Sequence, residues 1–156
     1  MTKWDLVVPT ASEGAMSANV SAHVGHARAH RAVFWDVNGD IRGKEAEALE
    51  GSYIYLVEKD TVEWRFTIAK VLPGHEMYTH WLDHDDFGKF FTESRKYKGK
   101  DLEDVENGDK CGTLILMTRP ESIDPIDVTE FTGKTGNRLI HPLRGSHRLV
   151  EPLDSC

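Results

Sequence analysis

The chain has 156 residues, of which 39% are hydrophobic and 9% are aromatic, and this is enough to bury the core of one domain. Its net charge of −7 excludes a uniformly basic nucleic-acid coat protein, and no apolar stretch approaches the roughly 20 residues of a membrane-spanning helix. No apolar signal-peptide core follows Met1, so we expect a cytoplasmic protein. Cys111 and Cys156 are the only cysteines, and they do not form a disulfide framework.

Strands and helices are predicted to alternate over the first third of the chain. Apolar runs bounded by Pro or turn residues indicate strands, and the Thr-x-x-Glu pattern of a capping box indicates a helix start. The predicted elements are a strand over 3–8, a helix from Thr10 to about Ala29, a strand over 31–37, and a short helix over 44–50 that ends at Gly51.

A β-hairpin is the clearest structural prediction. Residues 52–58 and 61–72 both have strand patterns, and Lys59-Asp60 connects them as a two-residue turn. The second strand alternates strictly between apolar and polar residues, so its apolar side chains are expected to share one face of a sheet. These side chains are Val62, Trp64, Phe66 and Ile68.

Further short helices and strands are predicted in the second half of the chain. Phe87, Phe90 and Phe91 have the i, i+3, i+4 spacing of residues on one helix face, which indicates a helix over 85–97. The other predicted elements are a buried strand over 112–118, an edge strand over 122–128 that contains Pro125, one helical turn over 129–134, and an extended tail over 139–153. This order predicts an α+β fold with a small, mostly antiparallel, barrel-like sheet flanked by short helices, in a single domain over 1–156.

Positive charge is concentrated near the end of the chain. Residues 131–150 include no acidic residue, whereas the rest of the chain has 15 basic and 26 acidic residues. A basic segment on an acidic body is typical of a protein that contacts phosphates at one place. The alternative is a solvated loop whose arginines pair with the acidic body. The basic side chains of this segment are Lys134, Arg138, Arg144 and Arg148.

The eight histidines suggest a metal-binding module as a further hypothesis. No cysteine or aspartate completes a ligand set beside the first group, and the second is not the His-Glu-x-x-His motif. We therefore expect no metal, and because no dinucleotide fingerprint or phosphate-binding glycine loop is present, no cofactor. The two groups are His23, His26 and His30, and His75, His80 and His84.

Two tryptophans lie beside polar residues. Trp35 precedes Asp36 at the end of a predicted strand, and Trp81 follows His80 in a polar stretch. A tryptophan in such a place can stack on a planar ligand while a neighbouring carboxylate reads the edge of that ligand, as in the recognition of an unpaired nucleobase. The alternative for Trp35 is an ordinary position in the core.

Three segments resemble the PUA-like superfamily, in particular the EVE domains and their YTH relatives. They are the first predicted strand with the turn over 9–13, the strand pair over 51–57 and 66–71, and the late strand, short helix and Arg-Gly-containing end over 123–131 and 139–152. The resemblance implies a domain that binds DNA or RNA and holds a modified nucleobase in an aromatic cage. It also implies a separate nuclease or ATPase subunit as a partner, as in modification-dependent restriction systems.

The resemblance assigns roles to individual positions. By position in the family pattern, the base pocket would be formed by Ser12, Trp35, Asp36 and Trp81, and the phosphates would be held by Lys134, Arg138, Arg144 and Arg148. The chain would then bind without catalysing a reaction.

A catalytic alternative comes from the ASCH branch of the same superfamily. In this alternative the chain is a small amidohydrolase that acts on a modified nucleoside. It resembles the ASCH branch, whose members use Lys, Thr and Glu in the equivalent pocket. Lys44, Glu45 and Thr67 would serve in this chain. No motif in the sequence requires an enzyme, so the sequence favours the binding domain.

Overall fold

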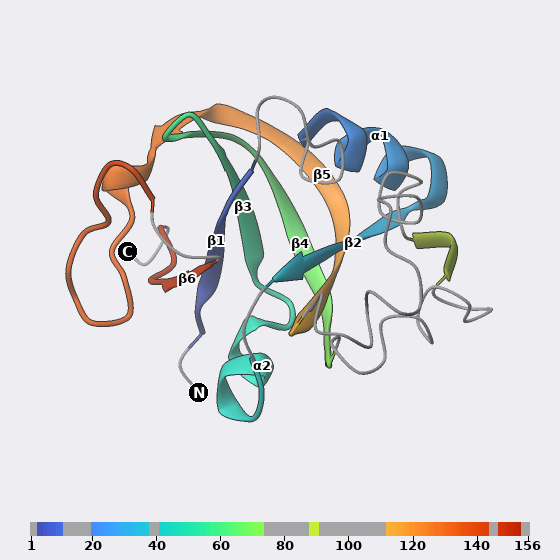
Figure 1. Ribbon diagram of the computed structural model, residues 1–156, viewed down its shortest axis with the longest axis horizontal. Helices are drawn as coiled ribbons and strands as arrows, with labels where there is room; N and C mark the ends of the chain where they lie inside the picture. The colour runs from blue at the N-terminus through green and yellow to red at the C-terminus, as the bar shows by residue number, and fades with distance from the viewer. Residues whose placement is uncertain are drawn as a thin grey trace, which may run out of the picture.

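Six strands form one sheet, which is flanked by two short helices (Figure 1). The computed structural model describes residues 3–10, 20–37, 41–73, 88–90, 112–143 and 147–153. The strands are β1 (Asp5–Pro9), β2 (Ala32–Val37), β3 (Tyr53–Glu58), β4 (Thr61–Pro73), β5 (Thr113–Asp127) and β6 (Arg148–Val150); the helices are α1 (Val20–His30) and α2 (Lys44–Leu49); the 3-10 turns are η2 (Gly88–Phe90) and η3 (Val128–Glu130).

The sheet is open and mixed, with the strand order β2-β5-β4-β3-β1-β6. All neighbouring strands are antiparallel except β1 and β3, which are parallel. The predicted α+β class is confirmed, but the prediction of a barrel is wrong. Closure would require hydrogen bonds between the edge strands β2 and β6. Among the described strands, β2 pairs with β5 alone and the three-residue β6 with β1 alone.

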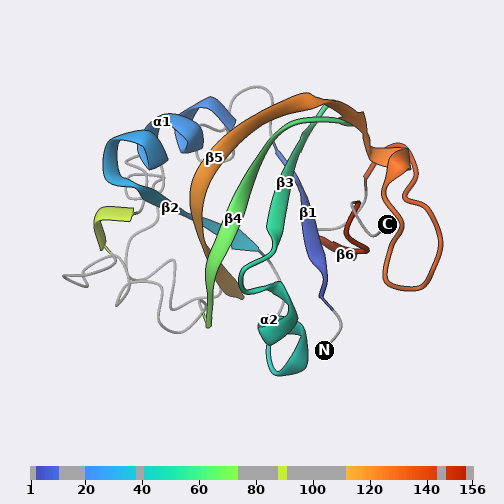
Figure 2. The same cartoon turned by 180° about the vertical axis from the view of Figure 1, so that it is seen from behind.

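The neighbouring inner strands β1 and β3 are buried on both faces. Alternate residues point to opposite faces of a sheet, so Leu6 and Val8 of β1 enter one apolar cluster and Val7 enters another. The first cluster contains the buried face of α1, and the second contains Val128 and Phe131 from the segment that follows β5. Figures 1 and 2 show α1 near β2 and β5, and the C-terminal segment beside β1 and β6.

A β-bulge changes the face on which Val62 lies. Val57 pairs with Val62 and Leu56 pairs with Trp64, so Glu63 is an extra residue in β4. The extra residue reverses the alternation, because each residue added to one strand shifts the side chains to the opposite face. Val62 therefore packs in the second cluster, whereas Trp64 packs against the first. The prediction that Val62 shares a face with Trp64, Phe66 and Ile68 is wrong.

The two strands predicted over 112–118 and 122–128 form a single strand, β5. Arg119 has a positive φ of 53° where the register against β4 shifts, and this bend lets the chain continue in the same sheet. β2 pairs with residues 113–118, and residues 121–127 pair with β4 alone among the described strands. The edge position predicted for Pro125 is confirmed, although Pro125 lies in the second half of a longer strand.

The predicted hairpin is confirmed. Lys59 and Asp60 both have positive φ, 51° and 64°, as a two-residue turn that matches the twist of its strands requires. The predicted helices over 10–29 and 85–97 lie partly outside the described residues, which include α1 and η2 from them. Among the described residues, no helix is long and apolar enough to cross a membrane.

The packing of the C-terminal segment onto the sheet predicts a large effect of a single substitution. Phe131 is fully buried, and its ring centroid lies 5.0 Å from that of Tyr55. Phe131→Ala should lower the free energy of unfolding by about 3–5 kcal/mol, measured by denaturant titration. Ile140→Ala is the control, because Ile140 is 65% exposed and its loss should cost no more than about 0.5 kcal/mol. Equal effects of the two substitutions would show that the segment does not pack as described.

Candidate functional site

An open groove of about 510 Å³ lies beside the C-terminal segment in the described structure. It is lined mostly by residues of the loop that follows η3 and of β6, with one residue from α2. Cationic, polar and apolar side chains all contribute. The lining residues are Glu45, Gly133, Lys134, Thr135, Asn137, Arg138, Leu139, Ile140, Leu143, His147, Arg148 and Leu149.

A tight hairpin forms one wall of the groove. Thr132 and Arg138 pair as an antiparallel bridge, and the N–H of Gly133 donates to the carbonyl of Asn137 at 2.7 Å. Gly136 has a φ of 91°, which glycine adopts without the strain of a side chain, and its N–H donates to the carbonyl of Gly133. The Gly133–Gly136 sequence is therefore the turn of a hairpin and not a phosphate-binding loop between a strand and a helix.

Backbone hydrogen bonds attach this hairpin to β6. Gly133 forms a bridge with Val150, and the N–H of Lys134 donates to the carbonyl of Leu149 at 3.1 Å. This pairing places Lys134 and Arg138 on the same groove as Arg148. Three of the four side chains predicted to bind phosphates therefore line one groove, and Arg144 lies outside the described residues.

Among the described lining residues of the groove, one has an acidic side chain and one an imidazole. Glu45 of α2 forms an ion pair with Lys134 across the groove. Burial lowers the pKa of His147, an effect that Glu45 opposes and Arg148 reinforces. At neutral pH His147 is therefore mainly the neutral imidazole, which has one hydrogen-bond donor and one acceptor.

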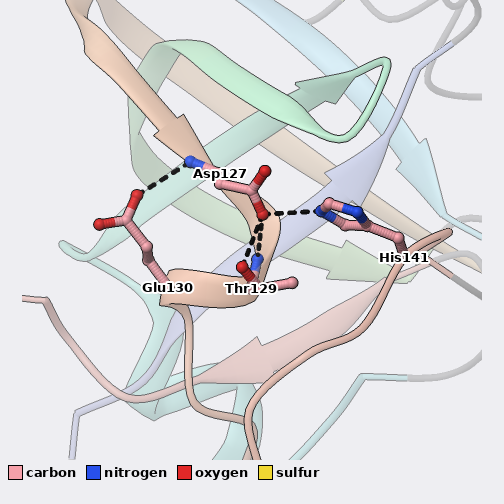
Figure 3. Close-up of polar contacts among 4 residues, drawn as sticks. All are labelled: Asp127, Thr129, Glu130 and His141. Atoms are coloured by element: carbon pink, nitrogen blue, oxygen red, sulfur yellow. Dashed lines mark hydrogen bonds and ion pairs between the residues drawn. The ribbon is translucent and has the colours of Figure 1, made fainter.

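A cluster around Asp127 anchors the loop (Figure 3). The Asp127 carboxylate accepts hydrogen bonds from the backbone and hydroxyl of Thr129, and the Asp127 N–H donates to Glu130. The Nε2 atom of His141 lies 2.7 Å from the same carboxylate. The bonds from Thr129, with His141, lower the pKa of Asp127 to about 2, and Asp127 raises the pKa of His141. This pair, the His141–Asp127 clasp, attaches the loop that follows η3 to the start of η3.

Trp35 and Asp36, two of the four residues predicted to form a base pocket, do not line this groove. Trp35 is only 4% exposed, and its ring centroid lies 4.7 Å from that of His23 in α1, within the first apolar cluster. Asp36 is half-buried on the same strand, β2. β2 and β6 are the opposite edges of the sheet, and neither Trp35 nor Asp36 lines the groove. Ser12 and Trp81 lie outside the described residues.

Of the three residues of the catalytic alternative, Glu45 alone lines the groove. Glu45 lines the groove, but its cationic partner is Lys134, and Lys44 is exposed at the start of α2. Thr67 lies within β4, where its carbonyl accepts a hydrogen bond from Thr118, and it does not line the groove.

The first histidine group is used in packing contacts. His23 is buried against Trp35, His26 Nε2 lies 2.8 Å from the carbonyl of Lys89, and the His26 and His30 rings are 4.4 Å apart. Among the described residues, no three metal-ligating side chains come together. The second group, His75, His80 and His84, lies outside the described residues.

Sequence reasoning missed several residues of the site. It did not connect Glu45 with Lys134, which are 89 positions apart, or His141 with Asp127. It also missed Thr135, Asn137 and His147 as lining residues. The glycines at 133 and 136 were the available signal for a hairpin turn, but no local pattern indicates which distant element faces it.

Comparisons of the chain with protein-family models, curated proteins and solved structures found no match.

The His141–Asp127 clasp predicts a pH-dependent contribution to stability. Because the pKa of His141 is raised, its contribution is complete below the ordinary value of 6.5 and is lost as pH rises through the raised value. Because the pKa of Asp127 is lowered, its contribution is complete above 3.8 and is lost as pH falls toward about 2. His141→Asn should therefore lower the free energy of unfolding most between about pH 4 and pH 6, and least above about pH 8.

Denaturant titrations of the two proteins across this pH range measure the difference. A difference that stays constant with pH would contradict an ionic clasp. Titration of His141 by NMR gives an independent check, because Asp127→Asn should return its pKa toward the ordinary value.

Proposed function

We propose that this chain is a nucleic-acid-binding domain that holds the phosphate backbone in the groove beside β6. The observation that supports this most strongly is that Lys134, Arg138 and Arg148 line one groove. The bridge between Gly133 of the hairpin and Val150 of β6 brings them together. Guanidinium groups bind phosphate oxygens through two parallel hydrogen bonds, and an ammonium group contributes a point charge.

The rest of the groove also suits a nucleotide. Its volume of about 510 Å³ lies within the range of small-molecule sites. Asn137 and Thr135 supply neutral hydrogen-bonding groups, and Leu139, Ile140 and Leu143 supply an apolar surface against which a sugar or base can pack. The net charge of −7 disfavours phosphates elsewhere, so binding would be confined to this surface.

The resemblance to EVE and YTH-like domains extends this proposal to a modified base. The described lining residues include no Trp, Tyr or Phe, and Trp35 is buried. Recognition of a modified base, and the partnership with a separate nuclease or ATPase, therefore rest on the sequence resemblance, whereas the groove supports the phosphate contacts. Because Trp35 is in the core, Trp35→Ala would test packing as much as binding.

The proposed phosphate contacts predict a specific salt dependence. Arg138→Ala and Arg148→Ala should each weaken binding to a short oligonucleotide, and should each reduce the slope of log K against log salt concentration by about 0.7 for a single strand. Fluorescence polarisation at a series of salt concentrations measures both quantities. Lys70→Ala removes an exposed positive charge from β4, outside the groove, and should leave the slope unchanged.

The oligonucleotide panel separates phosphate binding from base recognition. It consists of single- and double-stranded DNA and RNA, unmodified or with one methylated or hydroxymethylated base. Preference for one modified base would support the complete proposal. Equal binding of every oligonucleotide would support phosphate binding and contradict recognition of a modified base. Equal salt slopes for Arg138→Ala and Lys70→Ala would contradict the groove as the binding site.

Glu45 keeps the amidohydrolase alternative open, because a carboxylate beside a lysine and a neutral imidazole can serve acid–base chemistry. If the groove is catalytic, incubation with acylated cytidines should release free cytidine, and Glu45→Gln should abolish that release. We expect no turnover from the unsubstituted protein, and turnover that is lost in Glu45→Gln would replace the binding proposal with the catalytic one.

A further inference from the structure

An exposed apolar side chain lies among the cations of the groove. Ile140 is 65% exposed, more than any other large hydrophobic side chain that the structure describes, and it lines the groove with Lys134, Arg138 and Arg148. The next most exposed of these side chains, Leu153, is 36% exposed and does not line the groove. Most of the apolar surface of Ile140 is therefore left for a ligand that the cations hold.

The hairpin fixes Ile140 beside Arg138. Thr132 pairs with Arg138, and one step further in the same antiparallel register the N–H of Leu139 donates to the carbonyl of Phe131 at 2.9 Å. Successive side chains of a paired strand point to opposite sides. Leu139 is accordingly half-buried against the second apolar cluster, whereas Arg138 and Ile140 on either side of it are exposed. A guanidinium and an apolar side chain therefore line the groove from the same side of this segment, about 7 Å apart along it.

The apolar part of the groove extends beyond Ile140. Leu139 and Leu143 also line it, and both are packed against the second apolar cluster, so the core holds them in place. A ligand that covers Ile140 meets an apolar surface of three side chains next to the cations. The groove thus combines charge complementarity for phosphates with a surface that phosphates alone do not cover.

We propose that the groove binds unpaired nucleotides in preference to a duplex, with Arg138 on a phosphate and Ile140 against the face of a base. This inference rests on the proposed function, because it names the form of nucleic acid that the same groove holds. In a duplex the bases are stacked on one another, so a duplex offers phosphates to the cations but no apolar face to Ile140. An unpaired nucleotide offers both, and apolar side chains pack against extruded bases in this way.

Four fluorescently labelled probes test this inference by fluorescence polarisation. They are a single-stranded deoxyuridine oligonucleotide, a strand of equal length with abasic residues in place of its nucleosides, the deoxyuridine strand paired with its deoxyadenosine complement, and an oligouridine strand. The unsubstituted protein should bind the deoxyuridine strand more tightly than the abasic strand. The oligouridine strand differs by its 2′-hydroxyl groups, so the tighter of the two uracil-containing strands identifies DNA or RNA as the ligand.

Ile140→Ala should weaken binding of the single-stranded uracil probes about four- to fifteenfold. This is the effect of exposing one or two methylene-sized groups that the base had covered. The affinities for the abasic strand and the duplex should be unchanged. The salt slope of every probe should also be unchanged, because the substitution removes no charge.

Leu153→Ala is the matched control, because it truncates an exposed apolar side chain outside the groove. It should leave all four affinities unchanged. Ile140→Leu keeps the apolar surface and should retain most of the affinity for the single strands. Thermal unfolding of each variant establishes that the fold is retained.

Three results would overturn the inference while leaving the proposed function in place. One is an equal loss of duplex and single-strand binding in Ile140→Ala. Another is equal affinity of the unsubstituted protein for the abasic and deoxyuridine strands, which would show that no base is held. A third is unchanged single-strand binding in Ile140→Ala. In each case the smaller salt slope of Arg138→Ala would still identify the groove as the phosphate site. If the unsubstituted protein binds none of the probes at any salt concentration, the inference and the proposed function both fail.

Discussion

Burial of both faces of β1 and β3 is the constraint on which the rest of the structure depends. Their near-continuous apolar sequences leave no face for solvent, as is usual for parallel neighbours in a sheet. Helix α1 covers one face near β2 and β5, and the segment after β5 covers the other with Val128 and Phe131. The basic part of the chain is therefore drawn against the sheet by its apolar residues, and the groove forms where this segment meets β6 and α2.

The electrostatic organisation of the groove follows from that packing. Its cations belong to a covering loop and an edge strand, while most of the acidic residues lie elsewhere in the chain. Besides its backbone hydrogen bonds to β6, two side-chain contacts hold the loop at its two ends. The Lys134–Glu45 pair connects it to α2, and the His141–Asp127 clasp connects it to η3. The first contact occupies a cation that a ligand would use, whereas the second lies outside the lining of the groove, so they are expected to affect binding in different ways.

The place of Trp35 shows how one residue can suit two explanations until its neighbours are known. A tryptophan beside an aspartate matches the pattern of a base-stacking wall, but β2 has α1 packed against it, and the ring of Trp35 lies against His23 in that contact. An indole provides a large apolar surface for such a contact, and burying it stabilises the fold. The strand order then separates β2 from β6 by the full width of the sheet, so Trp35 and Arg148 lie on opposite edges.

The sequence alone determined the features that depend on neighbouring residues. These are the β3–β4 hairpin with its turn at Lys59 and Asp60, helix α2, the α+β class and the clustering of basic residues before Val150. Only the tertiary structure decided the features that depend on a partner strand. The bulge at Glu63 moved Val62 to the other face, the bend at Arg119 joined two predicted strands into β5, and the open edges replaced a barrel. The groove belongs to the second group, because alternation and charge are local properties of a sequence, whereas the approach of Glu45 to Lys134 is set by how distant segments pack.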